Sequence, residues 1–255
     1  MKKWGCGCNI DPVGAYGNWR ALEILHWPIA GACDRTFMLD GKIADQGQTS
    51  SCVGHGVARA IQLRLRAGVD TQAERPSALG VYLQARQGAG SARDGYPDDG
   101  ATIADACESV GFHGYCRESV WPFDAGEVTS ALPWDVAQAE FDQIGLKHHR
   151  LFGIGEDRCR MIRSALSAGC GVAIGIDVDA AFMDLHGSAA WPGLTSPSDG
   201  GHCMAALDWD LEALRVVNSW SKNWGDYGLG RITWGAIATQ ARSVWIIDAA
   251  VCYSS

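Results

Sequence analysis

The segment at residues 45–65, DQGQTSSCVGHGVARAIQLRL, changes from turn-forming residues to helical spacing at Cys52. From there an apolar residue recurs every four positions, at Val53, Val57, Ile61 and Leu65. This spacing predicts a helix of roughly four turns that begins at Cys52 and buries one face. The unpaired N–H groups and the dipole at a helix start favour a thiolate. The segment therefore indicates a reactive cysteine, with a buried, inert core cysteine as the alternative.

The rest of the chain changes from helical to strand character. Two further helices are predicted over SALGVYLQARQ at 77–87 and GATIADACESVG at 100–111, the second ended by Gly111. Short β-branched and aromatic segments follow, and the predicted strands are VAIGIDV (172–178), HCMAALDW (202–209), ALRVVNSW (213–220), LGRITW (229–234) and VWIIDAAV (244–251). Segregated helices and strands predict the α+β class.

We expect one domain built from two lobes. Its predicted parts are an N-terminal arm (1–45), a helical lobe (46–125), a β-rich lobe (126–243) and a C-terminal strand (244–255). The lobe boundary is placed near the Pro-, Gly- and Ser-bearing segment WPFDAGEVTSALPWD, residues 121–135. A cleft between two lobes is where a substrate would bind.

Composition excludes several classes of function. The net charge of −8 and the lack of a basic stripe argue against a nucleic-acid partner. No run of 18 apolar residues is present, and no apolar stretch of a signal peptide follows the initial lysines. We therefore expect a chain without membrane contact, in the cytoplasm.

Ten cysteines would suit a small secreted disulfide scaffold, but this chain is neither small nor visibly exported. Reduced thiols are expected instead. Cys6 and Cys8 in WGCGC could form half of a metal site, yet no second closely spaced pair follows with zinc-like spacing. The sequence predicts no metal and no cofactor.

Two later segments supply partners for Cys52. SDGGHCMAALDWD places His202 at the start of an apolar strand after a Gly-Gly turn, and RVVNSW ends a strand with Asn218. A Cys–His pair needs a third group to orient the imidazole, and an amide oxygen does this without adding charge. The order Cys52, His202, Asn218 therefore indicates nucleophilic catalysis.

With these residues the chain resembles the papain-like cysteine peptidases, and among them the compact bacterial and viral members. The motifs that carry the resemblance fall in family order over roughly residues 33–250: DQGQTSSC, DDGATIADACESVG, ESVWPFD, GGHCMAALDWD and NSWSKNWGDYGLGRI. The resemblance implies a papain-like fold, with a helical left lobe, a β-rich, barrel-like right lobe and the active-site cleft between them. It also implies a cysteine-type endopeptidase acting on peptides or proteins.

The resemblance assigns a role to each matching catalytic position. Cys52 matches the nucleophile, His202 the base and Asn218 the residue that orients the imidazole. Gln46 matches the glutamine whose side-chain N–H, with the backbone N–H of Cys52, stabilises the oxyanion.

Three further positions match residues that shape the cleft. Trp220 resembles the indole that shields the His–Asn hydrogen bond, Gly100 the glycine whose backbone pairs with substrate, and Cys203 a residue near the P2 pocket. Two positions depart from the family: Val53 replaces a usual Trp, and Thr49 a usual Cys.

Other titratable residues receive structural interpretations. His55 should lie along its helix flank. His148 and His149 are adjacent, so at most one could face a given site. Asp98 and Asp99 are expected in a solvated loop, with a possible preference for basic substrate side chains.

Two alternative functions stay open: a non-catalytic, papain-fold structural or binding component of a larger assembly, and an amidase or cell-wall peptide hydrolase with the same dyad. The 45 residues before Gln46 are too few for the helical pro-domain of secreted members. The arm is expected to dock on the β-rich lobe or on another protein, with virion association if the source is viral. Cys52 is expected to have a lowered pKa and to be alkylated first.

Overall fold

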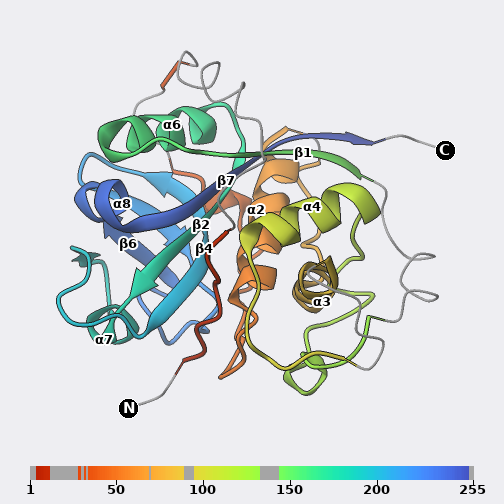
Figure 1. Ribbon diagram of the computed structural model, residues 1–255. Coiled ribbons are helices and arrows are strands. Elements are labelled where there is room, and N and C mark those ends of the chain that lie inside the picture. The colour runs from red at the N-terminus through yellow and green to blue at the C-terminus, as the bar shows by residue number, and fades with distance from the viewer. Residues whose placement is uncertain are drawn as a thin grey trace.

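The computed structural model describes residues 4–11, 28–29, 32, 34–68, 70–88, 95–132 and 144–252. Three helices lie on one side of the molecule: α2 (Cys52–Gly68), α3 (Ala78–Gly88) and α4 (Ile103–His113). Figure 1 shows them beside the sheet, with α2 nearest to the strands. Helix α2 begins at Cys52, as the spacing of apolar residues predicted.

Helix α4 ends later than predicted. Gly111 lies inside the helix, and the backbone leaves it at Gly114, which has a φ of 82° and donates its N–H to Val110 O. Glycine adopts this left-handed conformation without a Cβ penalty, whereas Gly111 has no such role. At the other end the Thr102 side chain accepts from Asp105 N, which caps the first turn.

Seven strands form one sheet: β1 (Ile144–Arg150), β2 (Gly171–Val178), β3 (Ala190–Trp191), β4 (Gly200–Trp209), β5 (Ala213–Val217), β6 (Leu229–Thr233) and β7 (Ala241–Cys252). Their order is β1-β7-β2-β4-β5-β6-β3, and every pairing is antiparallel except that of β3 with β6. Each predicted strand segment overlaps one of these strands. The remaining short elements are η1 (Thr36–Met38), η2 (Ala125–Glu127), α6 (Gly155–Ser167), α7 (Ala180–Met183) and α8 (Trp234–Gln240).

The central strands are apolar on both faces because each face borders a different core. Ala173 of β2 and Ala205 of β4 belong to the core shared with α2, α3 and α4. Their neighbours Ile174 and Met204 belong to the second core, which contains α6 and α8. Side chains of a strand alternate between faces, so β2, β4 and β7 separate two hydrophobic layers. The α+β class, with helices beside a β-rich half, is confirmed.

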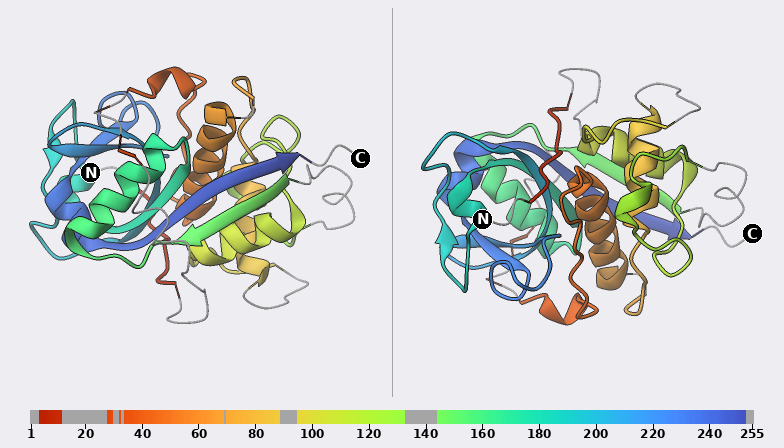
Figure 2. Two further views of the ribbon diagram at one scale, coloured as in Figure 1. Left: turned by 90° about the horizontal axis from the view of Figure 1, so that it is seen from above. Right: turned by 90° about the horizontal axis from the view of Figure 1, so that it is seen from below.

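Strands β1 and β7 extend beyond the rest of the sheet. Figure 2 shows this long pair running past α4 towards the C-terminus, and α4 contacts both strands. Strand β7 begins at Ala241, three residues before the predicted strand, and also pairs with β2. The predicted limits of arm, lobes and C-terminal strand remain a proposal.

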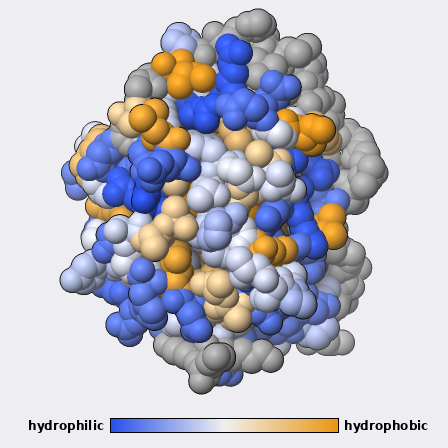
Figure 3. Space-filling view, turned by 90° about the vertical axis from the view of Figure 1, so that its left-hand side faces the viewer, coloured by the Kyte–Doolittle hydropathy of each residue, from blue (hydrophilic) through white to orange (hydrophobic). Residues whose placement is uncertain are grey.

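The surface carries scattered apolar residues. On the face in Figure 3, hydrophobic patches are small and separated by hydrophilic side chains. None of the helices in the described ranges is both long and apolar enough to cross a membrane.

Candidate active site

A hydrogen-bonded turn holds the start of α2. Thr49 Oγ1 donates to Gln46 O at 2.8 Å and lies 2.7 Å from Ser51 Oγ. The carboxylate of Asp98 accepts from Ser50 N at 2.8 Å and from Tyr82 Oη at 2.7 Å. Asp98 and Asp99 lie in a loop, as expected, with Asp99 exposed and Asp98 half-buried. In addition, the Asp98 carboxylate satisfies a backbone donor two residues before Cys52, a contact for which the sequence carries no signal.

The Cys52 side chain is fully buried where α2 meets β4. The helix approaches the strand closely because Gly56, one turn after Cys52, has no side chain. A Cβ on Gly56 would lie 2.6 Å from Cys203 Sγ. Cys203, the residue after His202, thus lies against the same helix face as Cys52, and its backbone N–H favours the Cys52 thiolate by lowering the pKa of that thiol.

His202 and Asn218 form a buried pair. His202 Nε2 lies 2.7 Å from Asn218 Oδ1, and Ser219 N also donates to that oxygen, at 2.7 Å. Since Oδ1 accepts the Ser219 N–H, it also accepts from Nε2, and a neutral imidazole then has an unprotonated Nδ1. The Nδ1 atom makes no hydrogen bond within the described ranges, so it does not bond to the Cys52 thiol in this structure.

Trp220 covers the pair. Its ring is fully buried and stacks on the His202 imidazole, with centroids 4.2 Å apart and planes at 27°. An indole in this position keeps water from the His202–Asn218 hydrogen bond, which strengthens it.

Gln46 is tied to the same segment. Its Oε1 accepts from Ser219 Oγ at 2.6 Å, and its backbone N donates to Ser219 O at 2.9 Å. Because Oε1 is occupied, the amide nitrogen faces the other way and donates to Thr49 O at 2.7 Å and to Gly5 O at 3.1 Å. Ser219 therefore connects Gln46 with Asn218, a link that sequence reasoning missed.

The N-terminal arm passes through this site. In Figures 1 and 2 the dark red segment runs between the strands and α2. Cys8 N donates to Gly201 O at 2.9 Å, and Asn9 N and Gly7 O bond to the backbone of Ala101, each at 2.9 Å. Residues 4–11 thus dock on their own chain, against both halves of the cleft.

Glycines allow the arm to lie this close. A Cβ on Gly5 would be 1.9 Å from Thr49 O, and one on Gly7 would be 2.1 Å from Ser50 O. Gly100 has a φ of +91°, and a Cβ there would lie 2.2 Å from Gly7 O. The pairing groups themselves belong to Ala101, the residue after the Gly100 predicted to pair with substrate.

Asp11 anchors the end of the arm. Its buried carboxylate accepts from Ala104 N at 3.1 Å and from Trp245 Nε1 at 2.8 Å. The Ser243 hydroxyl also donates to it, and Arg150 lies 3.6 Å away. A buried carboxylate with this many donors stays in place.

Burial by the arm sets the titration of the site. Burial raises the pKa of the Cys52 thiol well above its usual range, the Cys8 thiol raises it further, and N–H groups of Cys203 and Gly7 oppose the shift. Burial lowers the pKa of His202 to about 4, against a smaller rise from Asn218. The expected low thiol pKa is therefore wrong for this form, because Cys52 and His202 are both fully buried.

His55 and His148 pack against aromatic rings. The buried His55 ring packs edge-on against Phe123, with centroids 4.4 Å apart, and burial holds its pKa well below its usual range. His148 on β1 lies 5.8 Å from the Trp245 ring. Both fit the structural interpretation.

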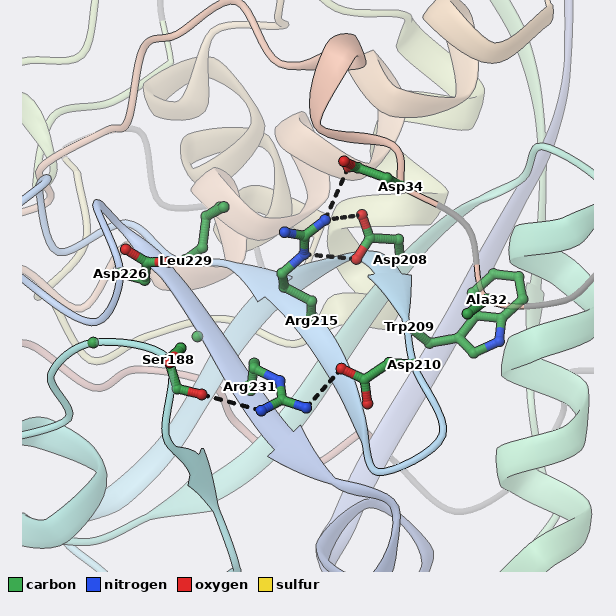
Figure 4. A pocket seen from close by; sticks show the side chains of 12 residues that line it. Ala32, Asp34, Ser188, Asp208, Trp209, Asp210, Arg215, Asp226, Leu229 and Arg231 are labelled. Atoms are coloured by element: carbon green, nitrogen blue, oxygen red, sulfur yellow. Dashed lines mark hydrogen bonds and ion pairs between the residues drawn. The ribbon is translucent and has the colours of Figure 1, made fainter.

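A separate surface cavity of about 410 Å³ lies over β5 and β6. Its lining includes none of the predicted catalytic residues. Figure 4 shows that its two arginines are paired: Arg215 with Asp208 and Asp34, and Arg231 with Asp210. In the described ranges, no group of three or more His, Cys, Asp or Glu side chains could hold a metal ion.

Solved structures share this architecture. Xylellain, a cysteine protease from Xylella fastidiosa, superposes with a TM-score of 0.74 and 22% identity, covering 97% of each chain. The chain has a papain-like fold. Procathepsin B S9 from Trypanosoma congolense matches with a TM-score of 0.77 and 15% identity, over 97% of this chain and 87% of that one. Procathepsin L 3 from Tenebrio molitor larval midgut matches with a TM-score of 0.71 and 18% identity, over 96% of this chain and 76% of that one. No family model and no curated protein sequence matches the chain.

Proposed function

We propose that the chain is a cysteine-type endopeptidase that hydrolyses peptide bonds and that this form is latent. The observation that carries the proposal is the His202–Asn218 hydrogen bond of 2.7 Å under the Trp220 ring, on a strand that packs against the helix beginning at Cys52. An oriented imidazole near a thiol at a helix start is the arrangement that cysteine nucleophiles require.

The chemistry follows from the atoms that are available once the arm leaves. Nδ1 of His202 takes the thiol proton, and the Cys52 sulfur attacks the substrate carbonyl carbon. The carbonyl oxygen becomes negative and accepts from Gln46 Nε2 and the Cys52 backbone N–H. The imidazolium protonates the leaving amine, and water then hydrolyses the thioester.

The arm blocks these groups in the present form. Gly5 O holds a Gln46 amide hydrogen, and Gly7 and Asn9 pair with the backbone of Ala101. A substrate strand cannot use these groups while the arm does. Control by the arm fits the similarity to two procathepsins.

Two other functions are alternative outcomes of the experiment described below. A non-catalytic binding component would retain the fold without needing the hydrogen bonds among Gln46, Ser219, Asn218 and His202. An amidase that acts on cell-wall peptides would use the same nucleophile and oxyanion donors.

The decisive experiment displaces the arm by adding one methyl group to it. Gly7→Ala places a methyl group 2.1 Å from Ser50 O, which the closed form cannot accommodate. We expect this variant to cleave a mixed fluorogenic peptide library, and Cys52→Ser in the same background to cleave nothing. Hydrolysis of cell-wall peptide fragments alone would favour the amidase, and no hydrolysis of either substrate would favour the binding component.

A further inference from the structure

Two thiols meet where the arm crosses β4. The Cys8 sulfur lies 2.9 Å from the position that a Cβ would take on Gly175. Gly175 is the partner of Cys203 in the antiparallel pairing of β2 with β4. Since opposite Cβ positions in such a pair are about 4.5–5.5 Å apart, the Cys8 sulfur lies on the same face as the Cys203 side chain and next to it.

Further contacts hold this arrangement in place. The Cys8 backbone N–H donates to Gly201 O at 2.9 Å, two residues before Cys203. Burial raises the pKa of the Cys203 thiol well above its usual range, and the second-largest contribution to this rise comes from the Cys8 thiol. The missing side chain of Gly175 provides the space that the Cys8 sulfur occupies.

The two thiols differ in access. Both are free in this structure, with Cys203 buried and Cys8 half-buried. A reagent from solvent therefore meets Cys8 first, and Cys203 is placed to react in a second, internal step.

We propose that Cys8 and Cys203 form a disulfide when the protein meets a small disulfide such as oxidised glutathione, and that this bond fastens the arm in the cleft. The Cys8 thiolate attacks one glutathione sulfur, which forms a mixed disulfide and releases one glutathione thiolate. The Cys203 thiolate then attacks the Cys8 sulfur, which breaks the mixed disulfide and releases the second. The two thiol protons pass to solvent, and one oxidised glutathione becomes two reduced ones.

The bond makes the arm a redox-controlled latch. This consequence rests on the proposed peptidase function, whereas the crosslink itself does not. Cys52 keeps its thiol, so reduction of the latch frees the cleft without any repair of the nucleophile.

Peptide mapping without reduction tests the crosslink. The wild-type chain is incubated with oxidised glutathione, alkylated and digested. We expect the peptide with Cys8 joined to the peptide with Cys203, also in Cys52→Ser and in the matched arm variant Cys6→Ser, and no joined Cys203 peptide in Cys8→Ser. A Cys8 peptide joined to Cys52 or Cys6, or free in every sample, would overturn the proposal.

Turnover of a fluorogenic peptide tests the latch. After oxidation and removal of glutathione, the wild type should lose activity at least about tenfold more than Cys8→Ser, and a dithiol should restore it. Equal losses would mean that Cys52 itself is modified and would overturn the latch. If the crosslink forms and no variant hydrolyses peptides, the crosslink stands and the proposed function falls, together with the control of activity by the latch.

Discussion

The Trp4 ring lies on the Trp220 ring, with centroids 5.6 Å apart and planes at 10°. Trp220 stacks in turn on His202. The first described residue of the arm therefore extends a column of rings that ends at the proposed catalytic base. The arm is held by side-chain stacking as well as by backbone pairing.

Trp4→Ala should increase activity. The side chain is 8% exposed, and an aromatic pair contributes about 0.5–1.5 kcal/mol beyond its buried area. Loss of the ring should raise the fraction of open molecules, and peptide turnover with it, by at least about tenfold. Ile10→Ala is the matched control, because Ile10 is an arm residue with 62% exposure. Similar turnover in the two variants would contradict the role of the Trp4–Trp220 contact.

Gln46→Ala should separate catalysis from latency. In the Gly7→Ala background we expect turnover to fall by about 10²–10³, as for loss of one oxyanion donor. In the otherwise native chain the same change also removes the bond to Gly5 O, so the arm should become more sensitive to added protease. A fall in turnover without this sensitivity, or loss of the folded state, would point to a different role.

Ser219→Ala tests the positioning of that amide. The Ser219 hydroxyl contributes one hydrogen bond, to Gln46 Oε1. A bond of this kind contributes about 0.5–1.5 kcal/mol, so kcat in the Gly7→Ala background should fall by about 2- to 13-fold with little change in KM. Ser219→Thr, which keeps the hydroxyl, should retain most of the rate. Equal loss in both variants would show that the hydroxyl does not position Gln46.

Sequence reasoning predicted the elements because their patterns are local. The four-residue apolar repeat after Cys52 defined α2, and β-branched runs defined β2, β4 and β7. The resemblance to a known family predicted the fold that the solved structures support. The predicted end of α4 at Gly111 was wrong because any of several glycines could end a helix, and only the backbone conformation shows that Gly114 does.

The state of the site could not be predicted in this way. WGCGC has no periodicity that shows where it docks, and its fit depends on close approaches between Gly5, Gly7 and backbone atoms far along the chain. The predicted pKa of the Cys52 thiol was wrong for the same reason. A helix start lowers this pKa, but burial together with the Cys8 thiol of the arm raises it more. The link from Ser219 to Gln46 spans 173 positions and leaves no local signal.

The stability of the arm-bound form should fall in acid. Burial lowers the pKa of His202 to about 4. Burial also holds the pKa of His55 well below its usual range, and the charges of Arg75 and Arg59 lower it further. An unfolded histidine titrates near pH 6.5. Between about pH 6.5 and 4 the unfolded state binds more protons, so the free energy of unfolding decreases as the pH falls.

Thermal unfolding between about pH 7 and 4.5 measures this effect. His55→Leu removes one of the two buried imidazoles and two ring nitrogens without hydrogen-bond partners in the described ranges. Its Tm should fall less steeply in acid than that of the wild type, and peptide turnover in the Gly7→Ala background should persist. Parallel Tm curves would show that His55 does not contribute to acid sensitivity.

The rate at which iodoacetate alkylates Cys52 tests the central claim most directly. In the wild type the thiol is buried beneath the arm, so labelling, located by peptide mass mapping, should be slow. In Gly7→Ala, Cys52 should be labelled first among the cysteines and at least about tenfold faster than in the wild type, because a thiolate beside an imidazolium at a helix start is the reactive species. Peptide turnover should be lost in proportion to that label. Equal labelling rates in the two proteins, or turnover that survives complete labelling of Cys52, would contradict the account.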